Sequence, residues 1–552
     1  MKKDNEYHCA RQSKYWQQLQ QLAKQSWSLD SLFTQDDTRA AHFSAQAGVL
    51  YMDYSKQCID DTVLDGLLGL ANSCDLSLRI DELMKGAMVN TSEARAALHT
   101  ALRLPETAKL QIDGQNVVAD VHHSLTQVAR LSERIRSETW RGFSGKAITD
   151  VVNIGVGGSD LGPLMATTAL DEWADTHINV HFVSNMDGTQ LDNLLKYLNP
   201  ETTLFIISSK SFGTVDTLSN AKTALSWLLG TAKSRAGTEG SVLRRHFIGI
   251  SANREKMCAW GIHPEHQLQL WEWVGGRFSL WSAIGLAIAI RIGMSGFKEL
   301  LAGAHSMDEH FSQADFSENL PVLLGLLAVW NSTFLKVNAH TVLPYDGRLS
   351  YLPSYLTQLE MESNGKSVTQ HGVRIDYSTC PILWGEIGSN AQHAFYQLLH
   401  QGTQQVSCDF IACVRRYHGS LKNTPLQQQH ELSLANCLAQ SRVLAFGNSA
   451  VAESKGTIGV DTDKYKYYRG NQPSTTLLLD ELTPYSLGSL VALYEHKVYV
   501  MASIWDVNPF DQWGVEMGKK MAESVHYAMQ HETKAPFDTS TDQLLQYIRQ
   551  LT

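Results

Sequence analysis

Hydroxyl side chains gather in one stretch of the chain, residues 208–217, whose sequence is SSKSFGTVDT. A short apolar run at 204–207 precedes it and predicts a buried parallel strand, and apolar residues at helical spacing follow it over 221–229. Because the first N–H groups of a helix lack intrahelical partners and the helix dipole is positive there, a helix start can bind an anion. One hydroxyl is enough to cap a helix, and this stretch offers five. A bound phosphate monoester is therefore favoured over a plain N-cap.

A glycine-rich loop, residues 153–162 (NIGVGGSDLG), follows another predicted strand. The dinucleotide fingerprint G-x-G-x-x-G would place its third glycine at Asp160, where a carboxylate would repel a pyrophosphate. The nucleotide P-loop pattern is also absent from the sequence. Gly157 and Gly158 permit close approach of the backbone to a ligand, and Ser159 adds a hydroxyl. A small sugar phosphate suits this loop better than a dinucleotide.

Two carboxylates, Glu360 and Glu362, end a predicted helix whose apolar stripe includes Leu352, Tyr355 and Leu359. Glu362 continues this stripe at i+3, whereas Glu360 lies about 200° of rotation away from it. We therefore expect Glu362 to be desolvated, which would raise its proton affinity toward that of a general base. A frayed helix end with Gly365 as its C-cap is the alternative.

His393 and Arg277 could act beside such a base. His393 lies in the first turn of a helix that is predicted to begin at Ser389, with a buried face made by Phe395, Leu398 and Leu399. The dipole there disfavours an imidazolium and keeps the ring neutral, although a lone histidine is more often a surface or structural residue. Arg277 follows Gly276 in a glycine turn that could present its guanidinium to an oxyanion.

A lysine near the C-terminus is a further candidate. Gln512, Glu516 and Lys519 are predicted to share one helical face at i, i+4 and i+7. We expect Lys520 to pair with Glu516 as a surface salt bridge, which leaves Lys519 for a site.

The composition argues against several classes of function. Of 552 residues, 43% are hydrophobic and 18% are charged, as in an ordinary soluble protein with two large domains. The net charge is −10 without a long basic run, which argues against nucleic acid and anionic membranes as partners. We expect no signal peptide, no membrane span and a cytosolic location.

Neither a disulfide framework nor a metal site is expected. The eight cysteines are scattered, and Cys408 and Cys413 are predicted to be core thiols. His263, Glu265 and His266 could suggest a metal site, but an intervening proline and the absence of H-E-x-x-H spacing favour loop histidines. We expect no metal and no redox cofactor.

The elements that must position these residues follow from the apolar pattern. Residues 1 to about 115 are predicted to be helical, and one helix over 92–102 would place His99 and Arg103 one turn apart as surface or capping residues. Apolar runs then alternate with helices at 151–156, 180–184, 204–207, 247–250 and 268–274, and again at 341–343, 381–384, 409–414 and 475–479. The pattern predicts an α/β fold with two doubly wound parallel sheets of related design and a site at the carboxyl ends of the strands.

The expected domain organisation has four parts. A helical segment over 1–115 packs on the large domain, two α/β domains span 116–292 and 293–510, and a helical arm spans 511–552. The last helix carries an apolar stripe that needs a covering surface, from Leu544, Leu545, Ile548 and Leu551.

Six stretches, in order along the chain, resemble the glucose-6-phosphate isomerase (phosphoglucose isomerase) family. They are 151–162 (VVNIGVGGSDLG), 208–217 (SSKSFGTVDT), 272–285 (EWVGGRFSLWSAIG), 361–366 (MESNGK), 392–403 (QHAFYQLLHQGT) and 504–519 (IWDVNPFDQWGVEMGK). The resemblance implies two sugar-isomerase-type (SIS) domains and a homodimer. It also implies reversible conversion of glucose 6-phosphate to fructose 6-phosphate, a step of glycolysis and gluconeogenesis, without a metal or redox cofactor.

Residue roles are implied by matching position within the family. Glu362 would be the base, His393 the ring-opening histidine, Lys519 the active-site lysine and Arg277 the arginine beside the enediol. The implied substrate contacts are Gly158, Ser159, Ser209, Lys210, Ser211, Thr214, Thr217, Gly276, Gln358 and Gln512. His393 would reach the site of the other subunit, so that catalysis would require the dimer.

Two positions depart from the family pattern: Gly213 stands where threonine is common, and Asp216 where glutamate is common. The glycine adds backbone freedom to the phosphate loop. A non-catalytic sugar-phosphate sensor of the same fold is the alternative to an enzyme, although it would not need Glu362, His393 and Lys519 together. A dehydrogenase is disfavoured by Asp160 in the glycine loop.

Overall fold

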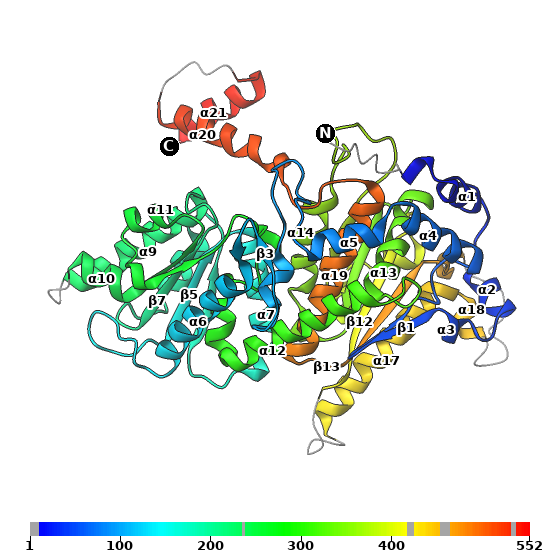
Figure 1. Cartoon of the computed structure of the whole chain (residues 1–552), viewed down its shortest axis with the longest axis horizontal. Coiled ribbons are helices and arrows are strands. Elements are labelled where there is room, and N and C mark those ends of the chain that lie inside the picture. Colours follow the sequence, from blue (N-terminus) through cyan, green and yellow to red (C-terminus); the bar gives the residue numbers. More distant parts are fainter. Residues whose placement is uncertain (1–9, 234–237, 417–423, 453–463, 532–536, 552) are drawn as a thin grey trace. The chain divides into compact units, whose positions relative to one another are not determined.

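The computed structural model describes residues 10–233, 238–416, 424–452, 464–531 and 537–551. The chain divides into two compact units, Met1–Pro509 and Phe510–Thr552. The first holds two large β-sheets and the helices that cover them (Figure 1). The described residues of the second form η12 (Trp513–Val515), α20 (Glu516–Gln530) and α21 (Thr539–Leu551). Among the described helices, none is both long and apolar enough to span a membrane.

The first sheet is parallel and confirms the expected strands. In chain order these are β5 (Asp150–Gly155), β6 (Asn179–Val183), β7 (Thr203–Ser208), β8 (Phe247–Ser251) and β9 (Gln267–Gln269), and their spatial order is β6-β5-β7-β8-β9. Strand β9 is shorter than expected because the chain turns at Trp271, whose carbonyl accepts from Val274 N. Gly155 lies opposite Ser208 in the ladder, so the loops after β5 and β7 leave the same edge.

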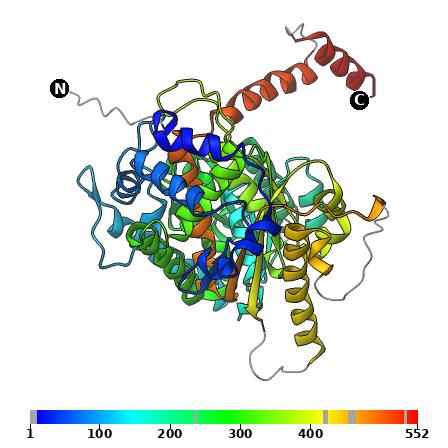
Figure 2. The ribbon, with the colours of Figure 1, turned by 90° about the vertical axis from the view of Figure 1, so that its right-hand side faces the viewer.

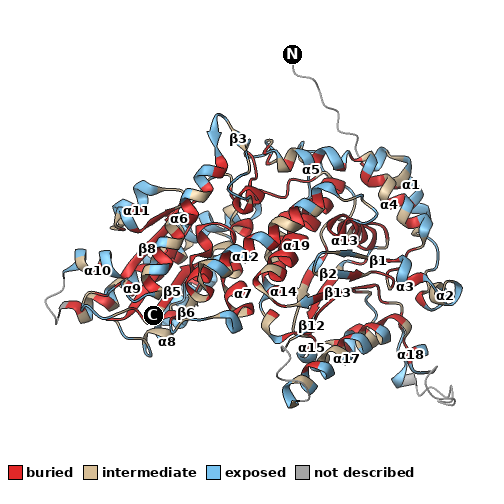
Figure 3. Cartoon of the chain, turned by 60° about the horizontal axis from the view of Figure 1, so that its bottom comes forward, coloured by how far each residue is buried: buried red, intermediate tan, exposed pale blue. Residues whose placement is uncertain are grey.

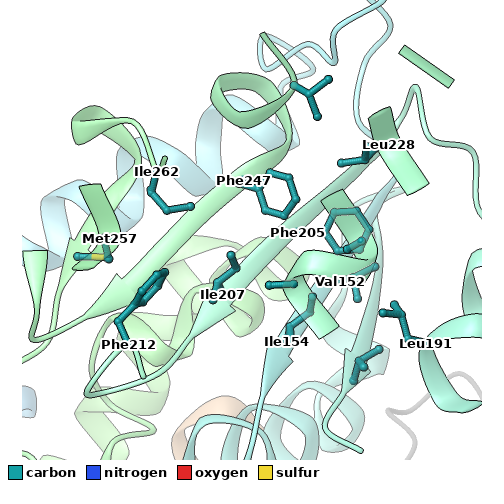
Figure 4. Close-up of a cluster of buried hydrophobic side chains, with 14 of the residues drawn as sticks. Val152, Ile154, Leu191, Phe205, Ile207, Phe212, Leu228, Phe247, Met257 and Ile262 are labelled. Atoms are coloured by element: carbon teal, nitrogen blue, oxygen red, sulfur yellow. The ribbon is translucent and has the colours of Figure 1, made fainter. Parts of the chain in front are cut away.

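Apolar residues on the central strands give this sheet its core. Val152, Ile154, Phe205, Ile207 and Phe247 are fully buried in one cluster (Figure 4). The surrounding helices are α6 (Val117–Arg136), α7 (Leu161–Ala169), α8 (Thr189–Leu195), α9 (Val215–Lys233), α10 (Glu239–His246) and α11 (Arg254–Trp260). Burial of the strands on both faces is the expected property of a parallel sheet covered by helices.

The second sheet also contains the expected parallel strands, β10 (Ala339–Pro344), β11 (Ile382–Gly385), β12 (Ser407–Arg415) and β13 (Ser474–Glu481). A hairpin from the N-terminal region, β1 (Ser44–Ala47) and β2 (Leu50–Asp53), extends it by antiparallel pairing with β13. The prediction of helices alone before residue 115 is therefore wrong. These strands are only four residues long, and an isolated two-stranded hairpin is only marginally stable, so the pairing of β2 with β13 stabilises them.

Helices cover both faces of the second sheet. Helix α17 (Pro425–Phe446) lies along one face (Figures 1 and 2). The other large helices are α12 (Leu286–Gln313), α13 (Leu320–Val329), α14 (Leu352–Asn364) and α19 (Pro484–Trp505), and shorter ones are α15 (Gly388–Ala394), α16 (Tyr396–Gln401) and α18 (Ser449–Ala452). Helix α19 is buried along nearly its whole length (Figure 3) and packs on α12, α13 and α14.

The two sheets repeat one design, as the sequence predicts. The order β6-β5-β7-β8 in the first sheet corresponds to β11-β10-β12-β13 in the second. After β5 the chain forms the 3-10 turn η3 (Gly157–Ser159) and then α7, and after β10 it forms η9 (Gly347–Leu349) and then α14. Strand β7 is followed by α9, and β12 is followed by α17. Each sheet therefore offers two strand-to-helix loops at its carboxyl edge.

The N-terminal region departs from the predicted helices in a second place. The expected helices at its start and at its middle are present as α1 (Lys14–Leu22), α2 (Leu29–Gln35), α3 (Arg39–His42), α4 (Asp61–Ser73) and α5 (Leu76–Met84). The helix expected over 92–102 is reduced to the 3-10 turn η2 (His99–Arg103). Glu93 bonds to Asn90 and Arg95, and Ala94 has φ +51°, so a turn replaces the expected start of the helix.

Buried charges connect this region to the core. Arg103, predicted to lie at the surface, is buried, with its Nη2 2.6 Å from Asp308 Oδ1 and its Nη1 2.6 Å from Glu495 Oε2. His99 is buried as well, and burial holds its pKa well below the ordinary value. Burial raises the pKa of Glu495, and Arg103 opposes that rise. These partners come from α12 and α19, which the local pattern around residue 100 does not reveal.

Candidate active site

The hydroxyl-rich stretch links β7 to α9, as the sequence predicts, and α9 begins at Val215. Ser209 Oγ lies 3.1 Å from Thr214 Oγ1. Ser209 N donates to Ile250 O at 3.1 Å, which holds the loop against β8. Two adjacent hydroxyls therefore stand at the start of a helix of 19 residues, where backbone N–H groups and the dipole favour an anion.

Three other polar residues of this loop have different surroundings. Ser208 Oγ donates to Asn153 Oδ1 at 3.0 Å inside the sheet. Thr217 is buried within α9, and its Oγ1 has no hydrogen-bond partner among the described residues. Lys210 Nζ donates to Glu272 O at 2.7 Å, and burial lowers the pKa of Lys210. Of the five hydroxyls, those of Ser209, Ser211 and Thr214 are therefore best placed for a ligand.

The glycine loop packs against the turn η6 (Gly276–Phe278) and against α14. A Cβ atom on Gly158 would lie 2.1 Å from Gly276 O, so a side chain there would collide with backbone. Gly157 has φ +60°, and a Cβ on it would lie 2.9 Å from Gln358 Nε2. These close approaches bring the residues that follow β5 together with Gln358 of α14.

Glu362 lies between Gln358 and Arg277. Gln358 Nε2 donates to Glu362 Oε2 at 2.9 Å, and Arg277 Nη1 lies 3.5 Å from Glu362 Oε1. Arg277 is itself fixed, because its Nε donates to Ser363 Oγ at 2.7 Å and its Nη2 donates to Pro509 O. The Glu362 side chain is 22% exposed and can therefore be reached by a ligand. A carboxylate held between an amide and a fixed cation can accept and return a proton.

The expected orientation of the two carboxylates on α14 is wrong. Glu360 is the residue that faces the core, and its Oε2 lies 2.8 Å from Nζ of buried Lys497. The buried line of α14 runs through Leu356 to Glu360, because α19 supplies Lys497 as a partner there. Glu362 instead points to the partly exposed side that carries Gln358. Its candidacy as a base therefore depends on its position beside Arg277 and not on desolvation.

A lysine that was not among the predicted site residues holds the end of α14. Lys366 Nζ donates to Glu362 O at 3.1 Å, Ser363 O at 2.8 Å and Asn508 O at 3.0 Å. It thereby satisfies two carbonyls of the last helical turn and fixes the backbone of Glu362. Its position four residues after Glu362 was the available signal.

His393 is exposed, and its expected place in a helix is wrong. Helix α15 ends at Ala394, and Phe395 has φ −136°, so His393 lies in the last turn of a short helix. Leu398, expected on the buried face, is exposed as well. The dipole argument for a neutral ring therefore does not apply. Within the described residues, His393 forms no hydrogen bond or ion pair.

Lys519 and Gln512 belong to the second unit and are described within it. Lys519 Nζ lies 2.9 Å from Glu516 Oε1, so Lys519, and not the expected Lys520, pairs with this carboxylate. Gln512 precedes the helix, with φ −149°, and does not share a helical face with Lys519. The expected helical face that Gln512 would share with Lys519 does not form, because α20 begins only at Glu516.

Asp160 is buried at the start of α7, next to the glycine loop. Burial raises its pKa to about 6, although a hydrogen bond from Ser184 opposes the rise. A carboxylate at this helix start opposes a second anion there, in agreement with the argument against a pyrophosphate.

One group of potential metal ligands occurs in the described part of the chain, where ligand atoms of His263, Glu265 and His266 lie within 4.8 Å of one another. Burial, the largest cause, and the neighbouring His263 and Arg134 together lower the pKa of His266 to about 3. Arg244 also lies 3.8 Å from Glu265. These positive charges oppose a bound cation, and we assign no metal to the group.

The first unit therefore brings together a phosphate-type loop, a glycine loop and one carboxylate flanked by an arginine. Such a set can hold an anionic substrate and move a proton on and off a carbon atom while a cation stabilises the resulting negative charge.

Comparison with known proteins gives concordant matches. The chain matches the phosphoglucose isomerase family over residues 53–545. A glucose-6-phosphate isomerase of Psychrobacter cryohalolentis is 84% identical over 550 residues, which cover 100% of this chain and 99% of that protein. Glucose-6-phosphate isomerase 2 of Chromohalobacter salexigens is 56% identical over 521 residues, 92% of each chain. The crystal structure of a glucose-6-phosphate isomerase from Chlamydia trachomatis is similar with a TM-score of 0.85 at 28% identity, covering 99% of this chain and 100% of that chain.

Proposed function

The chain belongs to the phosphoglucose isomerase family and interconverts glucose 6-phosphate and fructose 6-phosphate, and we propose that Glu362 is the group that moves the proton. The observation that supports this role is the placement of its carboxylate between Gln358 and fixed Arg277. Purified protein supplied with fructose 6-phosphate should form glucose 6-phosphate without any added nicotinamide cofactor. A protein that binds the sugar phosphate without product formation would favour the sensor alternative.

In the proposed mechanism the phosphate docks on Ser209, Thr214 and the helix start of α9. Once the ring is open, Glu362 removes the proton from C2 of the aldose and returns it to C1, while the proton of O2 moves to O1. Arg277 stabilises the negative charge of the cis-enediolate between these steps. One carboxylate can serve as base and acid because C1 and C2 are adjacent.

The proposed role of the 209–214 loop predicts a selective defect. Ser209→Ala combined with Thr214→Ala should raise KM for glucose 6-phosphate about 10²-fold or more, since two hydrogen bonds to a charged group, each worth about 1.5–3 kcal/mol, are lost. Steady-state kinetics would measure this, with Thr223→Ala on the exposed side of α9 as the matched control. An unchanged KM would mean that the two hydroxyls only cap the helix.

We also propose a homodimer in which His393 serves the site of the neighbouring subunit, opening the sugar ring together with Lys519. Exposed His393 has no bonded partner among the described residues. Within the apolar stripe of α21, Leu545 is buried, whereas Leu544 is 60% exposed and Leu551 is 71% exposed, which suits a helix that packs on another chain. We propose that the protein is located in the cytoplasm, where the reactions of glycolysis and gluconeogenesis take place.

Subunit mixing tests the shared site. Inactive His393→Ala and inactive Glu362→Gln chains, allowed to exchange, should regain activity, because each mixed dimer contains one site without either lesion. We expect about half the native activity per mixed dimer, measured after separating the species by differently charged tags. Mixed dimers that form and stay inactive would show that His393 acts within its own chain.

A further inference from the structure

A large cavity lies in the first unit, at the carboxyl edge of the second sheet. It has a volume of about 730 Å³ and lies outside the candidate active site. Asp346 and Arg348, from the turn after β10, line one side, and Arg416, directly after β12, lines another. The first turns of α17 contribute Leu426 and His430.

The repeat of the two sheets gives this cavity a counterpart. In the first sheet, the loops after β5 and β7 form the candidate active site, and α14 completes it with Gln358 and Glu362. In the second sheet, the corresponding strands β10 and β12 end at the cavity, and α7, the counterpart of α14, completes it with Thr167 and Thr168. The cavity therefore occupies the position in the second sheet that the substrate site occupies in the first.

Glu172 is the exposed anion that two arginines of the cavity share, while a third arginine of the lining, Arg291, pairs with Asp171. Arg348 Nη1 lies 3.0 Å from Glu172 Oε2, and Arg416 Nη2 contacts Glu172 Oε1. The same two arginines also contact Asp346, at 2.7 Å and 3.3 Å. Asp346 is buried, whereas Glu172 has a side chain that is 45% exposed on the short turn η4 (Asp171–Trp173). Glu172 can therefore leave the arginines at a small cost, and Asp346 cannot.

Two further features favour a ligand. Helix α17 has 22 residues and begins beside the cavity, so its dipole adds positive potential there. Thr167 is one of the residues around the cavity and is 6% exposed, and its buried hydroxyl has no hydrogen-bond partner among the described residues.

We propose that this cavity is a second binding site for a small phosphate monoester, whose phosphate replaces the Glu172 carboxylate between Arg348 and Arg416. The site is separate from Glu362 and does not depend on the proposed catalytic role. Because Glu172 competes with the ligand, its removal should strengthen binding, whereas removal of Arg416 should abolish it.

Calorimetric titration with inorganic phosphate tests the proposal on the full chain. The native protein should bind two equivalents per chain, and Ser209→Ala/Thr214→Ala should leave one. In that background, Glu172→Gln should tighten the remaining Kd about threefold to tenfold at low salt, in line with the small worth of exposed ion pairs. Arg416→Gln should remove the remaining equivalent.

Isomerase activity in an otherwise native chain serves as the folding control for Glu172→Gln and Arg416→Gln, and neither should change kcat. If Arg416→Gln fails to fold, the effect of Glu172→Gln on the Kd for phosphate is by itself the test of the proposed second site. A single equivalent in the native protein, lost in Ser209→Ala/Thr214→Ala, would overturn the proposal. An unchanged Kd in Glu172→Gln would overturn it as well.

Discussion

Glu362→Gln is expected to lower kcat for isomerisation by about 10²–10⁴-fold, because an amide cannot accept the C2 proton. Binding of the sugar phosphate should persist, since the 209–214 loop is untouched. Gln358 can still donate a hydrogen bond to the amide oxygen of the new Gln side chain at position 362, and Arg277 remains fixed by Ser363 and Pro509. The geometry of the site should therefore be preserved. Steady-state kinetics and titration with a phosphorylated sugar acid would measure the two effects separately.

The matched control is Glu299→Gln, which makes the same change on the exposed side of α12. This variant should keep native kcat and KM. Near-native turnover by Glu362→Gln in a preparation free of other isomerases would remove Glu362 from the mechanism.

The second large effect concerns stability. Glu360→Gln should lower the free energy of unfolding by about 3–5 kcal/mol, because it leaves the ammonium of Lys497 buried without its carboxylate. Both side chains are at most 2% exposed, so solvent screens the pair little. Urea denaturation, followed by circular dichroism, would measure the loss.

The double variant Glu360→Gln/Lys497→Met provides the internal control. Once the unpaired charge is gone, much of the stability should return, so the double variant should be more stable than Glu360→Gln alone. The single variant Lys497→Met completes the comparison. If the loss of stability in the double variant equals the sum of the losses in the two single variants, the buried pair does not act as a unit and the explanation is wrong.

The sequence was sufficient to predict the parallel strands of both sheets. Runs such as 204–207 are apolar without interruption, and their short length favours a strand buried on both faces over a buried helix. The hydroxyl-rich stretch could likewise be placed between β7 and α9, since a strand and a helix pattern flank it directly. The short hairpin β1–β2 could not be predicted from the sequence, because its partner β13 lies more than 400 residues away.

The orientation of single side chains was harder to predict. The apolar pattern of α14 predicts Glu362 in the core and Glu360 at the surface, the reverse of what the structure shows, because a helical wheel contains no information about Lys497 on α19. The local pattern predicts Arg103 at the surface for the same reason, since its partners Asp308 and Glu495 are distant in sequence. Charged residues are buried where distant partners exist, and local periodicity cannot reveal those partners.

The helix break beside His393 could not be predicted from the sequence either. Its helix breaks at Phe395, and a break of this kind, without proline or glycine, leaves no mark in the apolar pattern. The role of His393 was implied by resemblance to the family and remains a prediction. The same holds for Lys519, whose described contact is with Glu516.

The central claim is that a protein carboxylate carries the proton between C2 and C1. Isomerisation of fructose 6-phosphate in D₂O, followed by NMR of the glucose 6-phosphate formed, tests it most directly. A proton held on Glu362 can exchange with solvent before its return, so deuterium should appear at C2 in part of the product and accumulate over repeated turnovers. Product that stays free of deuterium at C2 through many turnovers would indicate direct hydrogen transfer between the carbons and would contradict the mechanism.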